Sequence, residues 1–213
     1  MTTTTDAVLE EPSAAAEESA HEPSPQQRMR ERLVPPMPTD RVWGWVGPLL
    51  VTALAGVLRL WDLGKPKDVM FDETYYAKDA YSLLQWGYER DIKEPKDQAD
   101  ERILAGDLDV WTDAPEYVVH PPVGKWVIAA GEKVFGMDPF GWRVAGAILG
   151  TIAVLVLARI ARRMFRSTLL GCFAGLLLAV DGLALVLSST ALLDGILAWL
   201  VIFGFGCLVL DRE

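Results

Sequence analysis

Long apolar runs constrain this chain more than any other feature of its sequence. Hydrophobic residues make up 51% of the 213 residues and are gathered into runs such as 148–157 and 192–210. Apolar runs of this length class cross a bilayer as helices. The sequence therefore predicts an all-α integral membrane protein, and the candidate functional residues are those at the ends of its spans.

Clusters of arginine indicate the direction in which each span crosses the membrane. We expect four spans, at residues 43–61, 142–160, 168–187 and 194–210. Cytoplasmic loops carry an excess of Arg and Lys, so we expect a multi-pass protein of the cell membrane with a cytoplasmic N-terminus and an extracytoplasmic loop at 62–141. The basic residues that set this orientation precede the first span and follow the second: Arg28, Arg30, Arg32, Arg41, Arg159, Arg162, Arg163 and Arg166.

Two segments outside the spans carry their own predictions. Residues 1–42 are acidic and rich in Pro, Ala, Ser and Thr up to a basic flank, which is typical of a disordered cytoplasmic tail, and residues 43–213 form the membrane domain. Residues 121–135 are apolar but short and contain Glu132 and Lys133, so we expect a helix lying on the outer surface of the membrane. Outside the basic flank no basic patch is interleaved with aromatic residues, and we expect no nucleic-acid partner.

The loop at 62–141 is unusually long. A loop of this length is commonly functional or disordered. Its first part is amphipathic and aromatic, whereas residues 89–116 are charged and interrupted by proline, a pattern typical of a variable insertion on water.

An acidic pair, Asp72-Glu73, stands just beyond the first span. Carboxylates next to hydrocarbon are costly unless they face water, a partner or a substrate, so the pair is a candidate functional site. The alternative is structural, because Asp72 is a good N-cap for a helix with an apolar face at Tyr76, Ala80, Leu83 and Leu84. Capping does not exclude chemistry, so both interpretations stay open.

Four more polar side chains are expected at the same membrane face: His120, Lys125, Arg143 and Asp194. Arg143 and Lys125 could bind phosphate, which would leave Asp72 to take a proton from an acceptor hydroxyl. Alternatively, Arg143 could anchor its span, Lys125 could snorkel to the interface, and Asp194 could cap its helix. Opposite charges at a lipid–water boundary suit a substrate that is part lipid and part anionic head group.

The order and spacing of these motifs resemble those of the protein O-mannosyltransferases. The resemblance runs from about residue 43 to the last residue and is greatest for the actinobacterial members. It is carried by Phe71-Asp72-Glu73, His120-Pro121-Pro122-Val123-Gly124-Lys125, Phe140-Gly141-Trp142-Arg143 and Leu192-Leu193-Asp194.

The resemblance implies a fold of the GT-C type, a multi-helix membrane glycosyltransferase that uses a lipid-linked sugar. In that family mannose passes from a polyprenyl phosphate carrier to Ser or Thr hydroxyls of proteins crossing the membrane, with inversion at the anomeric carbon. Carried over to this chain, Asp72 is the general base, Glu73 its partner in acceptor binding, and Arg143 a ligand of the carrier phosphate. The segment from His120 to Lys125 shapes the loop beside the site. The implied partners are the mannose donor, secreted or translocating acceptor proteins, membrane lipid and the translocation machinery.

This chemistry does not demand a metal. Inverting transfer needs a base on the acceptor and positive charge on the departing phosphate, which is already a good leaving group. Asp72 and Glu73 could contribute oxygen ligands to a divalent cation, but two carboxylates alone do not specify one.

Two departures limit the resemblance. Residues 188–190 read Ser-Ser-Thr where members of the family commonly carry an Arg, and members are longer, with more spans. The chain is therefore expected to be an N-terminal fragment, a truncated product or one part of a split enzyme, and such a piece can be inactive alone.

Two competing interpretations stay open. One is a GT-C transferase with a lipid or glycan acceptor, and the other is a non-enzymatic transporter subunit or scaffold. A transporter predicts ionisable residues along a path through the bilayer, whereas the ionisable residues other than Arg59 and Asp181 lie at the very ends of the expected spans or outside them.

Overall fold

A computed structural model describes residues 24–26, 28–29 and 36–211. It divides the chain into two compact units, residues 1–36 and 37–213, and the fold and site described below belong to the second. The predicted disordered tail, residues 1–42, falls for the most part outside the described residues.

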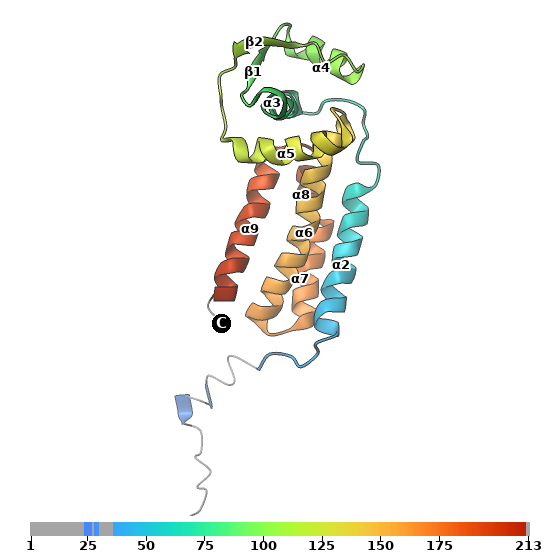
Figure 1. Ribbon diagram of the computed structural model, residues 1–213. Helices are drawn as coiled ribbons and strands as arrows, with labels where there is room; N and C mark the ends of the chain where they lie inside the picture. The colour runs from blue at the N-terminus through green and yellow to red at the C-terminus, as the bar shows by residue number, and fades with distance from the viewer. Residues whose placement is uncertain (1–23, 27, 30–35, 212–213) are drawn as a thin grey trace, which may run out of the picture. The chain divides into compact units, whose positions relative to one another are not determined.

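Long helices of the second unit form a bundle of membrane-spanning size (Figure 1). Three of them are long and apolar enough to cross a membrane: α2 (Trp43–Leu60), α6 (Pro139–Phe165) and α9 (Leu193–Asp211). A fourth candidate consists of α7 (Thr168–Val180) and α8 (Gly182–Ser189), which pass the same test together but are bent by 60°. Within the described residues the fold is thus a helical membrane fold with three to four candidate spans, as predicted.

The bend between α7 and α8 differs from the single span predicted at 168–187. Two charged side chains, those of Asp181 and Arg59, form hydrogen bonds at this bend. The Asp181 side chain accepts a hydrogen bond from the Ala184 N–H at 2.7 Å and so caps α8. Arg59, in the last turn of α2, donates to the carbonyls of Leu178 and Ala179 at 3.1 and 3.2 Å. Broken helices leave end groups unsatisfied, and these two side chains satisfy part of that need.

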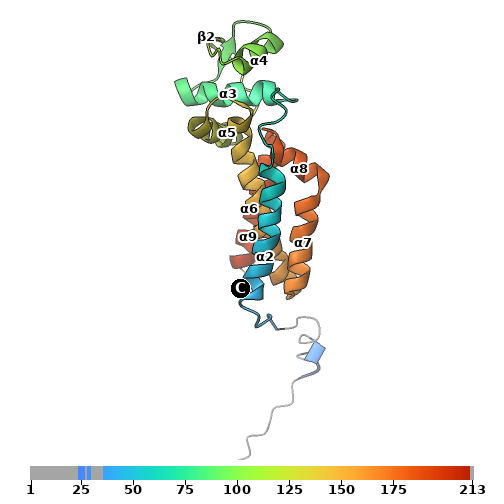
Figure 2. The same cartoon turned by 90° about the vertical axis from the view of Figure 1, so that its right-hand side faces the viewer.

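The chain between α2 and α6, residues 61–138, covers one end of the bundle, and we call it the cap. Figure 1 shows α5 lying across the end of the bundle, and Figure 2 shows α3 crossing over α5, with α4 and the strands beyond α3. The two strands pair antiparallel, a small sheet that the sequence did not predict. The cap consists of α3 (Glu73–Trp86), β1 (Arg90–Ile92), α4 (Lys96–Leu104), β2 (Trp111–Pro115) and α5 (Pro122–Phe135).

The corner between α5 and α6 holds α5 across the bundle. A Cβ on Gly131 would overlap the carbonyl oxygen of Gly141, and a Cβ on Gly141 would overlap that of Gly136, so the close approach at this corner requires glycine at both positions. Asp138 accepts a hydrogen bond from the Gly141 N–H at 2.7 Å and caps α6, and Pro139 follows at the first helical position. α5 is not a candidate span, and its contact with lipid stays a prediction.

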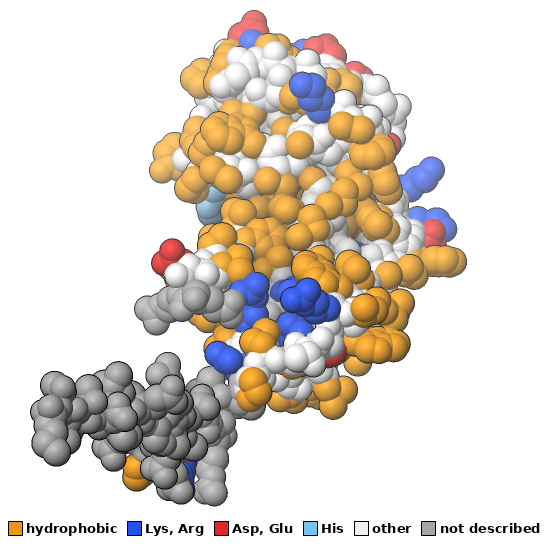
Figure 3. Space-filling model, turned by 60° about the horizontal axis from the view of Figure 1, so that its bottom comes forward, with side chains coloured by type: hydrophobic (Ala, Val, Ile, Leu, Met, Phe, Trp, Pro, Cys, Tyr) orange, Lys and Arg blue, Asp and Glu red, His pale blue; other side chains and the backbone are white. Residues whose placement is uncertain are grey.

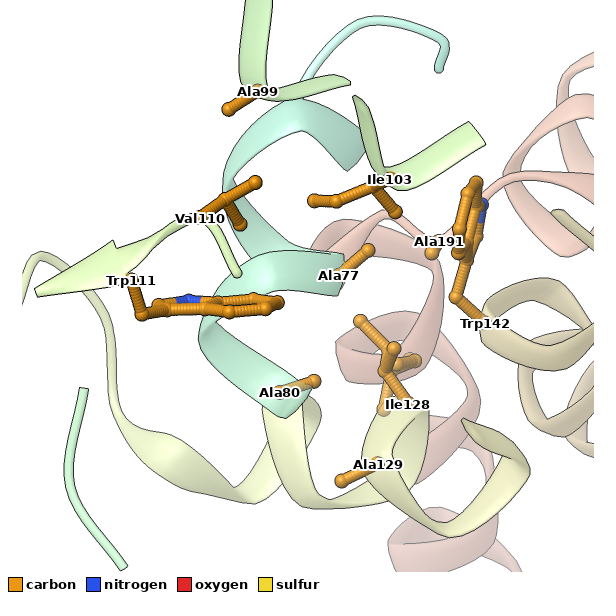
Figure 4. Close-up of a cluster of buried hydrophobic side chains, with 11 residues drawn as sticks. Ala77, Ala80, Ala99, Ile103, Val110, Trp111, Ile128, Ala129, Trp142 and Ala191 are labelled. Atoms are coloured by element: carbon orange, nitrogen blue, oxygen red, sulfur yellow. The ribbon is translucent and has the colours of Figure 1, made fainter. Parts of the chain in front are cut away.

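A buried apolar cluster joins the cap to the bundle. Figure 4 shows Ala77 and Ala80 of α3 facing Ile128 of α5, with Trp142 of α6 alongside. Ala99, Ile103, Val110 and Trp111 are also buried in this cluster, so residues 89–116 are not merely an insertion on water. The cluster fixes α3, and with it Asp72 and Glu73, against the end of α6.

The opposite end of the bundle carries arginines. Figure 3 shows Arg and Lys side chains gathered there among apolar ones. Arg162 pairs with Asp40 at 2.9 Å, while Arg159 donates to the Gly44 carbonyl at 2.6 Å and lies 4.0 Å above the Trp45 ring. The cytoplasmic location of this end stays a prediction from the positive-inside rule.

Candidate functional site

Asp72 stands at the N-cap position of α3, but its side chain makes no cap hydrogen bond. Within the part of the chain that the structure describes, Asp72 forms hydrogen bonds only through its backbone carbonyl, which accepts from the N–H groups of Tyr75 and Tyr76 at 2.9 and 3.0 Å. The carboxylate is exposed and lines a cavity of about 290 Å³. The predicted cap position is therefore confirmed without the cap bond, and the carboxylate is left available for chemistry.

The cavity lies inside the cap and brings together several of the predicted site residues. We call it the Asp72 pocket. Its walls come from α3, the start of α4, the segment after β2 and the start of α5. The side chains that line it are Asp72, Tyr75, Tyr76, Asp79, Lys96, Glu116, Tyr117, Val119, His120 and Lys125.

Tyr76 is the residue around which the predicted groups meet. Its ring meets His120 edge to face, with ring centroids 5.6 Å apart. Burial, followed by the negative charges of Asp72 and Asp194, raises the pKa of the Tyr76 phenol. Asp194, in the first turn of α9, is exposed, and its side chain makes no hydrogen bond within the described residues, so the predicted cap bond is absent. Asp72, His120 and Asp194 thus share one neighbourhood.

Tyr76 was not among the predicted site residues and entered the predictions only as part of an apolar helix face. A signal was present, since Tyr76 follows Asp72 by four residues and such pairs lie on the same side of a helix.

Glu73, unlike Asp72, is fully buried, and both of its carboxylate oxygens accept hydrogen bonds. Its Oε1 accepts from Arg143 Nε at 2.8 Å and from the Ala191 N–H at 2.9 Å. Its Oε2 accepts from Arg143 Nη2 at 2.7 Å and from the Met70 N–H at 3.0 Å. This carboxylate therefore joins α3 to α6 and to the chain before α9, and a role in acceptor binding would require it to leave these partners.

The guanidinium of Arg143 likewise has hydrogen-bond partners inside the protein for all of its N–H groups. Besides the two bonds to Glu73, it donates to the carbonyls of Leu63, Pro66 and Asp68 at 3.3, 3.0 and 2.8 Å. A guanidinium has five N–H donors, so all of them are used inside the protein. In this geometry Arg143 offers no N–H to a carrier phosphate, and it is too deeply buried to be an interfacial anchor.

Lys125 is buried as well, contrary to the snorkelling alternative. Its ammonium lies 2.9 Å from Asp79 and 2.8 Å from Glu89. Burial lowers the pKa of Lys125, but the hydrogen bonds to Glu89 and Asp79 outweigh burial and leave the pKa raised. Lys125 thus holds α5 to α3 and to the start of the sheet.

The predicted residues fall into two classes. The side chains of Glu73, Arg143 and Lys125 are buried and paired with one another or with neighbours, whereas Asp72 and Asp194 are exposed and open. The exposed carboxylates of Asp72 and Asp194, which lie around Tyr76 and His120, are accessible to a substrate. Within the described residues no group of three or more His, Cys, Asp or Glu is placed to hold a metal ion.

Comparison with known proteins identifies the family. The family model described as dolichyl-phosphate-mannose-protein mannosyltransferase matches residues 49–211. The chain belongs to this family. Its members have the GT-C type of fold, in agreement with the helical architecture described above. No solved structure gives a significant match.

Two mycobacterial relatives are named polyprenol-phosphate-mannose–protein mannosyltransferase. The chain is 42% identical over 181 residues to the protein of Mycolicibacterium smegmatis, covering 83% of this chain and 31% of the relative. It is 43% identical over 182 residues to the protein of Mycobacterium tuberculosis, covering 83% and 30%. The chain therefore spans less than a third of the length of these curated relatives.

A third relative carries another name. An undecaprenyl phosphate-alpha-4-amino-4-deoxy-L-arabinose arabinosyl transferase of Pseudomonas aeruginosa is 37% identical over 78 residues, which is 37% of this chain and 14% of that protein. The mannosyltransferase relatives match more than twice as many residues of this chain.

Proposed function

We propose that the chain forms a membrane mannosyltransferase active site, with the base for the acceptor and the cation for the carrier phosphate both lining the Asp72 pocket. In this proposal mannose passes from a polyprenyl phosphate carrier to Ser or Thr hydroxyls of secreted or translocating proteins, at the extracytoplasmic face of the cell membrane. The observation that carries the proposal is the contrast between adjacent carboxylates. Glu73 is buried in an ion pair, whereas Asp72 is exposed on the wall of a cavity and lacks its expected cap bond.

Asp72 is the general base in this mechanism. It takes the proton of the acceptor hydroxyl as the hydroxyl oxygen attacks the anomeric carbon from the face opposite the phosphate. The bond from the anomeric carbon to the phosphate oxygen breaks, the phosphate keeps the electron pair, and the configuration inverts. The phosphate is a good leaving group without a protonating acid, so one base and one cation suffice and no metal is required.

Glu73 and Arg143 act by position in this proposal. Their ion pair fixes the first turn of α3 against α6, and the bond from Ala191 brings the chain before α9 to the same point. Asp72 and Asp194 are thereby held near one phenol, that of Tyr76.

Lys96 is our candidate for the cation that faces the departing phosphate. Of the two lysines that line the Asp72 pocket, Lys125 is buried between two carboxylates. The Lys96 ammonium is held more loosely, 3.6 Å from Glu116 and 3.6 Å above the Tyr75 ring, with 40% of its side chain exposed. A loosely held ammonium can turn toward a phosphate without breaking a buried pair.

Transfer of radiolabelled mannose tests the proposal. The purified chain in lipid nanodiscs is incubated with polyprenyl phosphate mannose and a peptide with one Thr, and label in the peptide is the expected result. The same peptide with Ala in place of Thr should stay unlabelled. Label in lipid or glycan acceptors with none in the Thr peptide would favour the alternative suggested by the Pseudomonas relative. No label in any acceptor would overturn catalysis by this chain.

A further inference from the structure

Three exposed apolar residues follow β2 at the rim of the Asp72 pocket. Tyr117, Val118 and Val119 are 85%, 57% and 67% exposed. They belong to no helix or strand, although β2 ends only two residues before them. Consecutive apolar side chains exposed beside a polar cavity indicate a surface that meets a partner.

The backbone of this segment has no hydrogen-bond partner among the described residues. The last rung of the small sheet is the hydrogen bond from the Glu116 N–H to the Glu89 carbonyl, at 2.9 Å. Beyond this rung, no hydrogen bond within the described residues involves the backbone of Tyr117, Val118 or Val119. The sheet edge therefore continues as a row of free N–H and C=O groups, a template for another extended chain.

The side chains alternate as they do in a strand. Tyr117 and Val119 line the Asp72 pocket, whereas Val118 does not. This alternation is the pattern of an extended segment, in which successive side chains point to opposite faces, and it ends at His120, which lines the pocket as Val119 does. An extended chain added at this edge would lie next to the cavity that contains the Asp72 carboxylate.

We propose that residues 117–119 bind the acceptor polypeptide as an added β-strand and present its Ser or Thr to Asp72. The proposal rests on the proposed function and specifies how that site holds its acceptor. Main-chain hydrogen bonds supply the affinity in such β-augmentation, so acceptors of different sequence can bind in the same way. The aromatic and apolar groups of Tyr117 and Val119 contact alternate side chains of the acceptor.

Lipid is the other occupant that exposed apolar side chains suggest, and the backbone argues against it. Hydrocarbon offers no partner to N–H and C=O groups, and each unsatisfied group in lipid costs several kcal/mol. A polypeptide satisfies these groups and covers the apolar side chains together.

Proline substitutions at neighbouring positions can distinguish the two edges of the segment, because each removes an N–H that faces one edge. The Glu116 N–H points toward β1, and backbone groups of successive residues point to opposite edges, so the N–H of Val118 points toward β1 and that of Val119 points away from it. Val119→Pro removes an N–H that faces the acceptor. Val118→Pro is the matched control, since it introduces the same ring one residue away in an extended conformation that proline tolerates.

Binding of a fluorescent Thr peptide, measured by anisotropy without a mannose donor, tests the proposal. We expect Val119→Pro to weaken binding about three- to tenfold, the equivalent of one main-chain hydrogen bond, and Val118→Pro to change the affinity less than twofold. Equal loss in both variants, or no loss in Val119→Pro, would overturn β-strand docking. So would Val118→Trp fluorescence that is quenched by brominated lipid and unaffected by the peptide.

The assay also separates this proposal from the proposed function. Peptide binding that shows the proline asymmetry supports strand docking even if no mannose is transferred, in which case only the catalytic proposal fails. Normal transfer together with equal affinities of wild type and Val119→Pro contradicts strand docking alone.

Discussion

Arg143 donates two parallel hydrogen bonds to Glu73, of 2.8 and 2.7 Å, where the side chains are only 1% and 0% exposed. Removing one partner from such a buried pair leaves an uncompensated charge, which typically costs about 3–5 kcal/mol. We therefore expect Glu73→Gln and Arg143→Met each to lower the thermal unfolding midpoint in detergent. The double variant Glu73→Gln, Arg143→Met should recover part of the loss.

The exposed pair Lys65–Asp62 is the control, with side chains 68% and 57% exposed and 3.2 Å between charged atoms. Exposed pairs contribute about 0–1 kcal/mol, so Lys65→Met should leave the midpoint nearly unchanged. A Glu73→Gln protein that unfolds like wild type yet transfers no mannose would show that Glu73 contacts substrate.

Lys96 yields a prediction about the donor. If its ammonium faces the carrier phosphate, Lys96→Met should raise KM for polyprenyl phosphate mannose about tenfold or more, since a hydrogen bond to a charged group is typically worth about 1.5–3 kcal/mol. Lys93→Met, which removes a lysine paired with Asp109 outside the pocket, is the matched control. An unchanged donor KM in Lys96→Met would assign the phosphate to another cation.

Glu132 predicts how stability depends on pH. It is buried in α5, its carboxylate oxygens have no hydrogen-bond partner within the described residues, and burial raises its pKa well above 4.5. A group whose folded pKa is raised contributes stability that is fully present below the unfolded pKa and is lost as pH rises through the folded value. The unfolding midpoint should therefore fall as pH rises above about 4.5.

Glu132→Gln cannot ionise, so it should flatten this part of the pH profile, whereas Glu101→Gln on the exposed side of α4 should leave the slope unchanged. Equal slopes for wild type and Glu132→Gln would mean that Glu132 is not the group responsible.

The membrane orientation is open to direct labelling. With Cys172 and Cys207 replaced by Ala, Gln98→Cys in the cap should react with a membrane-impermeant thiol reagent in intact cells. Ser167→Cys, beside the arginines at the opposite end of the bundle, should react only after the membrane is permeabilised. The reverse pattern would place the Asp72 pocket in the cytoplasm.

The sequence predicted the parts of the fold that depend on local patterns. The spans follow from apolar runs, and the helix after Asp72 follows from the spacing of Tyr76, Ala80 and Leu84. The bend at Asp181 was missed because α7 and α8 are both apolar. It is stabilised by Arg59, which is distant in sequence.

The site residues could be named from the sequence, but their partners could not. Arg143 and Lys125 carry charges that suit a phosphate, and only the structure brings Glu73 against one and Asp79 against the other. Such pairs form between residues up to seventy positions apart, and no local pattern encodes them. The free edge at 117–119 could not be predicted either, since the two short strands were not predicted from the sequence.

Mannose transfer by Asp72→Asn tests the central claim most directly. Asparagine preserves size and helix-capping ability but removes the base, and a positioned general base typically contributes about a hundred- to ten-thousand-fold. We predict that the variant unfolds at the wild-type midpoint, binds the Thr peptide normally, and transfers radiolabelled mannose at least a hundredfold more slowly. Transfer at the wild-type rate by Asp72→Asn would contradict the account.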